Sequence, residues 1–277
     1  MDISVIIPIH VGGDEIEPYL NKAMESVVLQ KKVEELPVVY VVHTPDIKDW
    51  VQGWKDGMIR KHSDKGVNHE KIVLIQNDGN SSYQSQVNLG VKSIDTTFFT
   101  VLEFDDEFST TYFKNAVQHI KAYPKVDVFL TMMIEVNEKN EGLKTTNEMV
   151  WAQQFVGENG EMGYLNQNAL KQYTDFKLSG ALIKKSEFEA IGGYKNNIKL
   201  TFMYEFLLRA LNNSATIFCI SRIGYKHLAD RKGSMFDEYQ RTIPVEERRF
   251  WFETATNESN FINDRVIDTS SLAQKQK

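Results

Sequence analysis

Short apolar runs alternate with amphipathic stretches through the first half of the chain. The first run, Ile3–Ile9, carries a single polar residue, Ser4, and fits a strand buried on both faces, as in a parallel sheet. Apolar residues then recur at helical spacing from Ile16 to Val28, and Pro18 lies early enough to be tolerated in a first turn. Four more strands are expected at Leu36–Val42, Lys71–Gln76, Phe98–Leu102 and Val126–Ile134, with helices starting near Ser81 and after Ser109. This alternation predicts an α/β fold with a mostly parallel central sheet, right-handed crossovers and helices on both faces.

The pattern weakens in the second half of the chain. Residues 137–175 are polar and weakly periodic, and we interpret them either as a lid or insertion beside a site or as a surface excursion with a few packing aromatics. The elements expected after them are a strand over 178–183, a turn at Gly192-Gly193, a helix over 202–211 and a strand over 216–220. The domain division predicted from this is an α/β half at 1–135, a smaller region of the same domain at 136–235, and a helical extension at 236–277 with a disordered tail from Ser270.

Composition narrows the class of protein. The chain has 277 residues, which suits one large α/β domain, and its net charge of −6 gives no global support for a nucleic-acid partner. The single cysteine, Cys219, excludes a disulfide framework and a zinc site built on cysteines. The N-terminus has no basic leader, and no window offers eighteen uncharged apolar residues in a row. We therefore expect a soluble, cytoplasmic protein without a membrane span.

An acidic cluster follows the strand predicted at Phe98–Leu102. Side chains alternate along a strand, so Glu103 and Asp105 are expected to share one face, with Asp106 beside them. Ligands of open α/β sheets bind at the carboxyl ends of the strands. Carboxylates there suit Mg²⁺ or Mn²⁺, which can neutralise a leaving diphosphate. We predict a metal site, and the alternative is a solvated acidic turn.

A second group of polar residues lies between Tyr225 and Ser234. His227 is predicted to be a further metal ligand. Arg231, Lys232 and Ser234 are predicted to hold phosphate oxygens in a loop that closes over a diphosphate. The alternative for this segment is a basic surface loop.

Taken together, four segments resemble the family 2 glycosyltransferases with the A-type nucleotide-sugar fold, GT-A. They are Ser4–His10, similar to the opening strand; Leu20–Gln30, similar to the first helix; Leu102–Phe108, similar to a Leu-Asp-x-Asp-Asp-Glu-Leu metal motif; and Ile191–Tyr194 with Glu205–Arg209 and Tyr225–His227, similar to the acceptor-side half. The resemblance covers roughly residues 3–234 and is carried by the order and spacing of the segments. It implies a nucleotide-diphospho-sugar donor, foremost a UDP-sugar, a Mn²⁺ or Mg²⁺ ion, and transfer of a hexosyl or pentosyl group to an acceptor hydroxyl. Residues 1–135 are then the nucleotide-sugar-binding half.

The resemblance also implies a set of donor-binding residues. They are Pro8, Ile9, His10, His43, Asp78, Asn88, Glu103, Phe104, Arg231, Lys232 and Ser234. Three departures from the family pattern bear on this set. Glu103 replaces the first aspartate of the metal motif, and the second strand ends in Val42–Asp46 where the family has Asp-Asp-Gly-Ser. The family's Arg-Asn-x-Gly reads Val87–Gly90, which keeps Asn88 and loses the arginine.

The catalytic base is expected on the helix over 202–211. The family shows Glu-Asp about six residues before an arginine, and counting back from Arg209 gives Phe202-Met203. Glu205 is the first candidate and Asp175 the second, because an inverting transfer needs a base that deprotonates the acceptor hydroxyl. The alternative for Glu205 is an ion pair with Arg209 at i,i+4. Loss of the usual base also allows a retaining mechanism.

Two other functions stay open at this point. One is a sugar nucleotidyltransferase, although the turn His10–Asp14 lacks the Arg or Lys that such enzymes carry. The other is a non-catalytic relative that binds nucleotide-sugars without transfer. The oligomeric state is open too.

The acceptor is expected to be a saccharide or another hydroxyl carrier such as a lipid-linked glycan or a protein. Bacteriophage members of the family offer a further alternative, hydroxymethylated DNA, which would place the enzyme in the host-cell cytoplasm. The residues that would contact a phosphate backbone or stack on a flipped base are Lys184-Lys185, Arg222, Lys226, Arg231, Lys232, Arg248-Arg249 and Phe250–Phe252. We favour the alternative of a solvated basic edge with packing aromatics.

Overall fold

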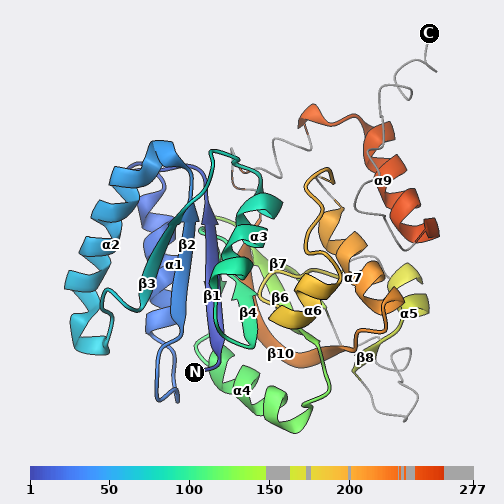
Figure 1. The fold of residues 1–277 in the computed structure, drawn as a ribbon, viewed down its shortest axis with the longest axis horizontal. Helices are drawn as coiled ribbons and strands as arrows, with labels where there is room; N and C mark the ends of the chain where they lie inside the picture. The colour runs from blue at the N-terminus through green and yellow to red at the C-terminus, as the bar shows by residue number, and fades with distance from the viewer. Residues whose placement is uncertain are drawn as a thin grey trace.

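One twisted sheet organises the chain in the computed structural model, which describes residues 1–147, 163–172, 176–198, 201–229, 231, 234 and 241–258. Across the described residues the strand order is β3-β2-β1-β4-β9-β6-β10-β5, with β7 paired to β6 and β8 to β10. Figure 1 shows this sheet in the middle of the molecule, with helices on both sides of it. The predicted α/β architecture is confirmed.

The N-terminal strands form a parallel layer. Strand β1 (Ile3–Ile9) pairs in parallel with β2 (Val38–His43) and with β4 (Phe98–Val101), and β3 (Ile72–Gln76) lies outside β2. All seven residues of β1 are buried. An apolar run without alternation therefore became a central strand covered on both faces, as its pattern predicts.

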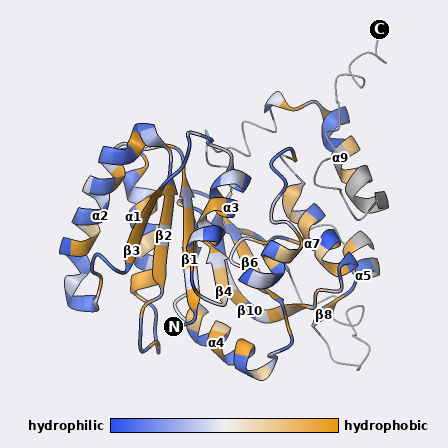
Figure 2. Cartoon of the chain, viewed as in Figure 1, coloured by the Kyte–Doolittle hydropathy of each residue, from blue (hydrophilic) through white to orange (hydrophobic). Residues whose placement is uncertain are grey.

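The two faces of the sheet carry different helices. Helices α1 (Glu17–Val28), α2 (Lys48–His62) and α4 (Tyr112–Ala122) pack with the odd-numbered residues of β1 in one core cluster. Helices α3 (Tyr83–Ser93), α6 (Lys185–Ala190) and α7 (Phe202–Asn212) pack in the other, which includes Ile6. Figure 2 shows the result as apolar strands inside helices whose outer faces are hydrophilic.

The second half of the chain continues the same sheet in a mixed orientation. Strand β9 (Leu182–Lys184) lies antiparallel between β4 and β6 (Val128–Val136), and the long strand β10 (Ile217–Leu228) runs parallel to β6. Short strands border them: β5 (Glu107–Phe108), β7 (Gly142–Thr146) and β8 (Tyr164–Leu165). The smaller helices are η1 (Pro45–Ile47), η2 (Ser63–Lys65), α5 (Gln167–Gln172) and α9 (Val245–Glu258).

Several boundaries differ from the sequence prediction. The strand expected over 178–183 begins only at Leu182, because Gly180 turns the backbone at φ +69°. Helix α4 begins at Tyr112, with Thr111 as its N-cap in place of Ser109. By contrast, Ser82 caps α3 through its side chain, which accepts a hydrogen bond from the Ser85 amide.

Parts of the weakly periodic region are ordered. Residues 142–146 return beside β6 as a hairpin strand, and β8 and α5 follow further along. The remainder of the region and the tail from Ser270 lie outside the described residues. Among the helices that the structure describes, none is long and apolar enough to cross a membrane.

Candidate functional site

The acidic segment is a turn rather than the end of a strand. Strand β4 ends at Val101, and the Leu102 amide donates to the Ile6 carbonyl at 2.9 Å. The Asp106 amide then closes a turn on the Glu103 carbonyl at 3.1 Å. Strand alternation therefore does not apply to Glu103 and Asp105, and the prediction that these two share a ligand face is wrong.

The turn instead brings Glu103 and Asp106 together with His227 of β10. One ligand atom from each of these three residues lies within 4.8 Å of the others. The His227 Nδ1 atom is 3.0 and 3.1 Å from the two carboxylate oxygens of Asp106, and the Leu228 amide donates to Asp106 at 2.8 Å. Asp106 is 1% exposed. We call Glu103, Asp106 and His227 the acid–histidine cluster.

Asp105 points to a different partner. Its Oδ2 atom accepts a hydrogen bond from the Arg231 Nε at 2.6 Å. The Arg231 guanidinium also lies 5.1 Å from the ring centroid of Phe104 and 5.8 Å from that of Tyr19. The predicted metal ligand Asp105 is thus engaged in an ion pair, and His227, also predicted, lies in the cluster.

Glu103 is held in place by residues from distant parts of the chain. The Ser179 hydroxyl donates to Glu103 Oε1 at 2.9 Å, and the Glu103 amide donates to the Tyr225 hydroxyl at 3.0 Å. Gly180 makes this possible, because a Cβ atom there would lie 2.4 Å from the Tyr225 ring. Sequence reasoning missed Ser179 and the role of Tyr225, since neither spacing nor composition connects residues 103, 179 and 225.

The protonation of the cluster reflects its excess of carboxylates. Burial and the charge of Asp106 raise the pKa of Glu103 to about 7. Burial lowers the pKa of His227, but the charge of Asp106 and its hydrogen bond outweigh that effect and raise the pKa to about 10. Burial and the charge of Asp106 also raise the pKa of Asp105, against the opposing charge of Arg231. The raised pKa values of Glu103 and His227 both reflect local negative charge, which a divalent cation would also offset.

The donor set of the cluster fits such a cation. Carboxylate oxygens suit Mg²⁺, Ca²⁺ and Mn²⁺, whereas imidazole nitrogen suits transition metals, so two carboxylates with one histidine favour Mn²⁺. Burial also supports the fit, since two like charges held this close in a poorly solvated turn are costly without a counter-charge. Glu103, Asp106 and His227 would hold the ion.

The predicted donor-binding residues cluster at the carboxyl ends of the first strands. Ile9 of β1 is in register with His43 of β2, and Leu102 hydrogen-bonds to β1 beside them. His43 is buried, with its Nδ1 atom 2.9 Å from the Thr44 carbonyl oxygen. Pro8 and His10 flank Ile9, and Asp78 lies exposed in the turn after β3, where it accepts from the Asn80 amide. This edge of the sheet is where ligands of α/β proteins bind.

Three further predicted donor residues, Arg231, Lys232 and Ser234, follow β10 in the chain. Arg231 lies beside the turn, and its carbonyl accepts from the Ser234 amide at 3.1 Å. Lys232 lies outside the described residues.

Asn88 does not face this site with a free amide. Its Nδ2 donates to the Tyr194 carbonyl at 2.7 Å, and its Oδ1 accepts from the Tyr194 amide at 2.9 Å. Both ends of the side chain are committed to backbone. The structure thus shows Asn88 in a contact within the protein, and its donor-binding role stays a prediction.

Glu205 forms the ion pair with Arg209 that was the alternative to a role as catalytic base. Its two oxygens lie 2.7 and 3.0 Å from Arg209 nitrogens, and the Lys195 Nζ lies 3.3 Å from Oε1. The carboxylate is 1% exposed. This geometry argues against Glu205 as the catalytic base, because an acceptor hydroxyl cannot reach it. Asp175, the second candidate, lies outside the described residues.

The basic residues that could meet a phosphate backbone are largely paired. Lys184 lies 2.9 Å from Asp127, Lys226 lies 2.5 Å from Glu107, and Lys185 donates to the Ile94 carbonyl at 2.6 Å. Of the aromatic residues of α9, Phe252 stacks on Tyr204 with ring centroids 5.2 Å apart. These contacts match the alternative of packing aromatics and a solvated basic edge.

Comparison with known proteins agrees with this arrangement. The family model described as Glycosyl transferase family 2 matches residues 4–191, which is more than half of the chain. Among solved structures, S. aureus TarS residues 1–349 in complex with UDP-GlcNAc superposes with a TM-score of 0.66 at 16% identity, over 99% of this chain and 70% of that one. The same TarS fragment in complex with UDP gives 0.60 at 16% identity, over 91% and 78%.

The longer S. aureus TarS structure also has this fold, with a TM-score of 0.60 at 16% identity. The chain matches in full but spans only 46% of that protein. No curated protein matches the chain in a sequence comparison.

Proposed function

The chain belongs to glycosyl transferase family 2, and on this premise we propose that it transfers a sugar from a nucleotide-diphospho-sugar to an acceptor hydroxyl with the help of a divalent metal ion. Its membership makes it a glycosyltransferase, and its fold is the GT-A type that the sequence predicts. The donor, the metal and the roles of single residues are the proposal. Transfer needs a site that binds a diphosphate and stabilises it as it leaves.

The observation that carries the proposal is the acid–histidine cluster at the carboxyl end of β4. It combines two carboxylates with an imidazole, and it lies next to the end of β1, where α/β folds bind nucleotides. The proposed ligands are Glu103, Asp106 and His227. When bound, Mn²⁺ or Mg²⁺ supplies positive charge that neutralises the departing nucleoside diphosphate.

The protein's own residues prepare this charge stabilisation. Ser179 and Tyr225 fix Glu103, and the Leu228 amide fixes Asp106, so both carboxylates keep their positions. Arg231 lies over Phe104 beside the turn, and we propose that its guanidinium exchanges Asp105 for a phosphate oxygen of the donor. The electrostatic contribution is largest where water is excluded, as it is around this buried turn.

A UDP-sugar is the proposed donor. Support comes from the TarS complexes with UDP-GlcNAc and UDP, which share the fold, and from the apposed strand ends at Ile9 and His43. The aspartates that the family places at the end of the second strand are replaced here by His43 and Thr44. Both residues are buried, so we propose that the base packs against this strand end.

The proposed acceptor is the hydroxyl of a saccharide or another glycan. DNA is the less supported acceptor, because three of the cations that would follow its backbone, Lys184, Lys226 and Lys185, pair with acidic residues or with a carbonyl group. Of the aromatic residues predicted to stack on a flipped base, Phe252 instead stacks on Tyr204 within the protein. We propose no base at Glu205, and Asp175 stays the predicted one.

Calorimetry and a turnover assay test this proposal. UDP, GDP and ADP are titrated into the protein with and without 1:1 Mn²⁺, and UDP-GlcNAc is then incubated with the protein and a panel of saccharides. We expect UDP to bind only with metal, and UDP-GlcNAc to release UDP. Release of UTP on addition of pyrophosphate would indicate a nucleotidyltransferase, and metal-dependent binding without turnover of any nucleotide-sugar would indicate a non-catalytic relative.

A further inference from the structure

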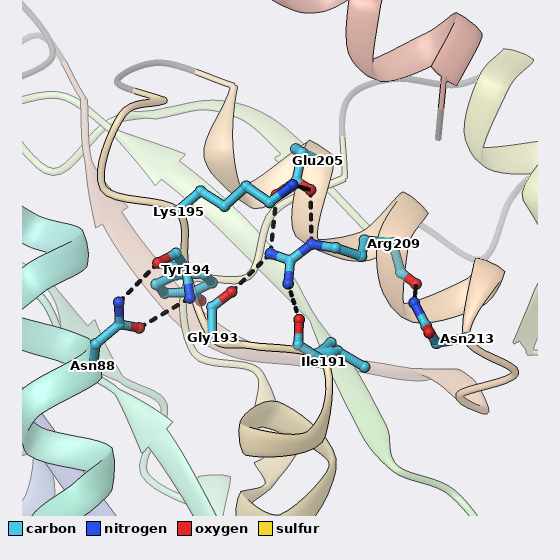
Figure 3. A network of polar contacts seen from close by, with 8 residues as sticks. All are labelled: Asn88, Ile191, Gly193, Tyr194, Lys195, Glu205, Arg209 and Asn213. Carbon is cyan, nitrogen blue, oxygen red and sulfur yellow. Dashed lines mark hydrogen bonds and ion pairs between the residues drawn. The ribbon is translucent and has the colours of Figure 1, made fainter. Parts of the chain in front are cut away.

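The segment Ile191–Ile198 lies between α3 and α7 and is fastened to both helices by polar side chains, as Figure 3 shows. It follows α6 and begins with the turn Gly192-Gly193, in which both glycines have positive φ, +88° and +65°. We call it the clamped segment. It joins α6 to the helix that carries Glu205, and it faces the helix that follows β3.

Helix α3 supplies the first clamp. The Asn88 side chain makes two hydrogen bonds to the backbone of Tyr194. Its Nδ2 donates to the Tyr194 carbonyl at 2.7 Å, and its Oδ1 accepts from the Tyr194 amide at 2.9 Å. A Cβ atom at position 193 would lie 2.7 Å from the Asn88 Oδ1, so only glycine leaves room for this contact. One turn earlier on α3, Gln84 donates to the Ile198 carbonyl.

Helix α7 supplies the second clamp. Arg209 donates to the Gly193 carbonyl at 2.7 Å and to the Ile191 carbonyl, while Glu205 holds the guanidinium. The Lys195 side chain reaches the same carboxylate from within the segment. All three charged residues are buried, so their geometry is fixed by mutual contacts that are costly to break singly.

Tyr194 is what these clamps hold in place. Its ring packs edge-on against Phe188, Phe202 and Phe206, with centroids 5.1 to 5.2 Å apart. On its other side lies Tyr83, the first residue of α3, with ring centroids 6.4 Å apart. Tyr83 also packs on Phe202 at 5.3 Å and is only partly buried.

Tyr83 begins α3 directly after the turn that follows β3, so it lies at the carboxyl edge of the parallel strands, the same edge at which the acidic turn follows β4. Burial raises the pKa of Tyr83, and the charges of Glu103 and Asp106 raise it further. Burial and then the charge of Glu103 raise the pKa of Tyr194. The clamped segment therefore sets the position of an aromatic pair whose Tyr83 lies at the edge of the sheet that carries the proposed metal ligands.

We propose that Asn88 is a positioning residue, which fixes Tyr194 and through it the partly exposed Tyr83 beside the acid–histidine cluster, and which does not bind the donor. The inference rests on the proposed function in that Tyr83 borders the sugar that is transferred. It differs from the donor-binding role that the family resemblance implies for Asn88. Both polar atoms of the Asn88 side chain hydrogen-bond to the Tyr194 backbone. Removal of these hydrogen bonds should therefore loosen the packing of Tyr194 against Tyr83 and leave the strand ends at Ile9 and His43 unchanged.

The test compares Asn88→Asp with Asn68→Asp. The first substitution replaces the donor to the Tyr194 carbonyl by an acceptor, whereas Asn68 accepts from two amides in the turn before β3, at the opposite edge of the sheet from the site, and an aspartate keeps those contacts. Three quantities are measured for each protein: amide hydrogen exchange of peptides covering residues 188–198, the Kd for UDP with Mn²⁺, and kcat and KM for release of UDP from UDP-GlcNAc.

For Asn88→Asp we expect faster exchange in the clamped segment, a UDP Kd within about threefold of wild type, and a kcat reduced on the order of 10- to 100-fold, as misplacement of a reacting group by about 1 Å produces. Asn68→Asp should match wild type in all three. A weaker UDP Kd with unchanged exchange would overturn the proposal in favour of a donor contact. Faster exchange with unchanged kcat would overturn it in favour of a purely structural role.

A second variant covers the case in which Asn88→Asp does not fold. Tyr83→Leu keeps the Asn88 contacts and an apolar side chain against Phe202 but removes the partly exposed aromatic ring, so it should leave exchange unchanged and still lower kcat. An unchanged kcat in Tyr83→Leu would refute the link between the clamp and the reaction. Absence of UDP binding or turnover in the wild type would instead count against the proposed function, and the exchange data would still report on the clamp.

Discussion

The turn at the end of β4 and the ion cluster behind the clamped segment both bury carboxylates beside cations. The first contains Glu103, Asp105 and Asp106 with the cations His227 and Arg231, so carboxylates are in excess. In the second, Glu205 meets Arg209 and Lys195, so cations are in excess and their donors point at carbonyl groups.

The two clusters also differ in how tightly their groups are committed. Every contact around Glu205 is internal, and helix α7 provides two of the three members at i,i+4. In the acid–histidine cluster the pKa of Glu103 rises to about 7, mainly from burial and the charge of Asp106, which indicates a carboxylate short of a counter-charge. A buried acid is therefore a candidate for chemistry when its neighbours leave negative charge uncompensated, and a structural element when they do not.

The largest effect is expected from Asp106→Asn. The amide keeps an acceptor for the Leu228 amide but removes the charge that, by our proposal, holds the metal. Turnover of UDP-GlcNAc should fall by more than the roughly 10- to 100-fold that loss of an outer contact to a metal ligand costs. Glu107→Gln, in the same acidic run but paired with Lys226, is the matched control and should stay near wild type. Equal losses in both variants would mean that the whole run acts only through its charge.

Substitution of Glu205 in the second cluster should lower the stability of the protein and leave metal binding unchanged. Glu205→Gln removes the buried carboxylate that pairs with Arg209 and Lys195, and the free energy of unfolding in urea should fall by roughly 3–5 kcal/mol. The control is Glu189→Gln, which breaks an exposed i,i+4 pair with Lys185 and should cost about 1 kcal/mol or less. A stable Glu205→Gln protein without activity would return Glu205 to the role of base.

A smaller effect is expected from Ser179→Ala. The hydroxyl donates to Glu103, so its loss should weaken Mn²⁺ binding by about 10-fold, at the low end for an outer contact. Ser93→Ala removes a hydroxyl that donates to the Leu89 carbonyl on the exposed side of α3 and serves as control. Mn²⁺ affinity measured by calorimetry distinguishes them, and an unchanged affinity in Ser179→Ala would remove Ser179 from the site.

Arg231→Gln should weaken the binding of UDP without weakening the binding of Mn²⁺. We expect the Kd for UDP with Mn²⁺ to rise by roughly 10-fold, the value of one hydrogen bond to a charged group, while the affinity for Mn²⁺ alone changes little. Lys226→Gln removes a cation of strand β10, close to Arg231 in the chain, that pairs with Glu107, and it should leave the UDP Kd unchanged. If both variants weaken UDP binding equally, the effect is one of general charge and the specific role of Arg231 is wrong.

Much of the fold follows from the apolar pattern of the chain, and the reasons are visible in single elements. Ile3–Ile9 has no polar face, so it had to lie inside a sheet, and Ser82 had the side chain to cap α3. Helix α2 was not predicted, although Val51, Trp54 and Met58 lie on one buried stripe at helical spacing. Its apolar stripe is interrupted by polar residues and by Gly53, so the signal is weaker than that of α1.

The candidate site was predicted in part, and the error has a physical cause. The position of the acidic segment and the participation of His227 followed from the order of motifs. The expectation that Glu103 and Asp105 share one face rested on strand alternation, which carries no information here because β4 ends at Val101 and the chain then turns. The Asn88 clamp could not be predicted from spacing, since Tyr194 lies 106 residues further along the chain.

The central claim is that Glu103, Asp106 and His227 bind a divalent cation, and pulsed electron paramagnetic resonance of the Mn²⁺-loaded protein tests it most directly. We predict one bound Mn²⁺ with nitrogen modulation from an imidazole in the wild type and in Asp105→Asn. The modulation should disappear in His227→Gln, and the bound ion should be lost in Asp106→Asn. Nitrogen modulation that survives in His227→Gln, or Mn²⁺ bound by Asp106→Asn as tightly as by the wild type, would contradict the assignment.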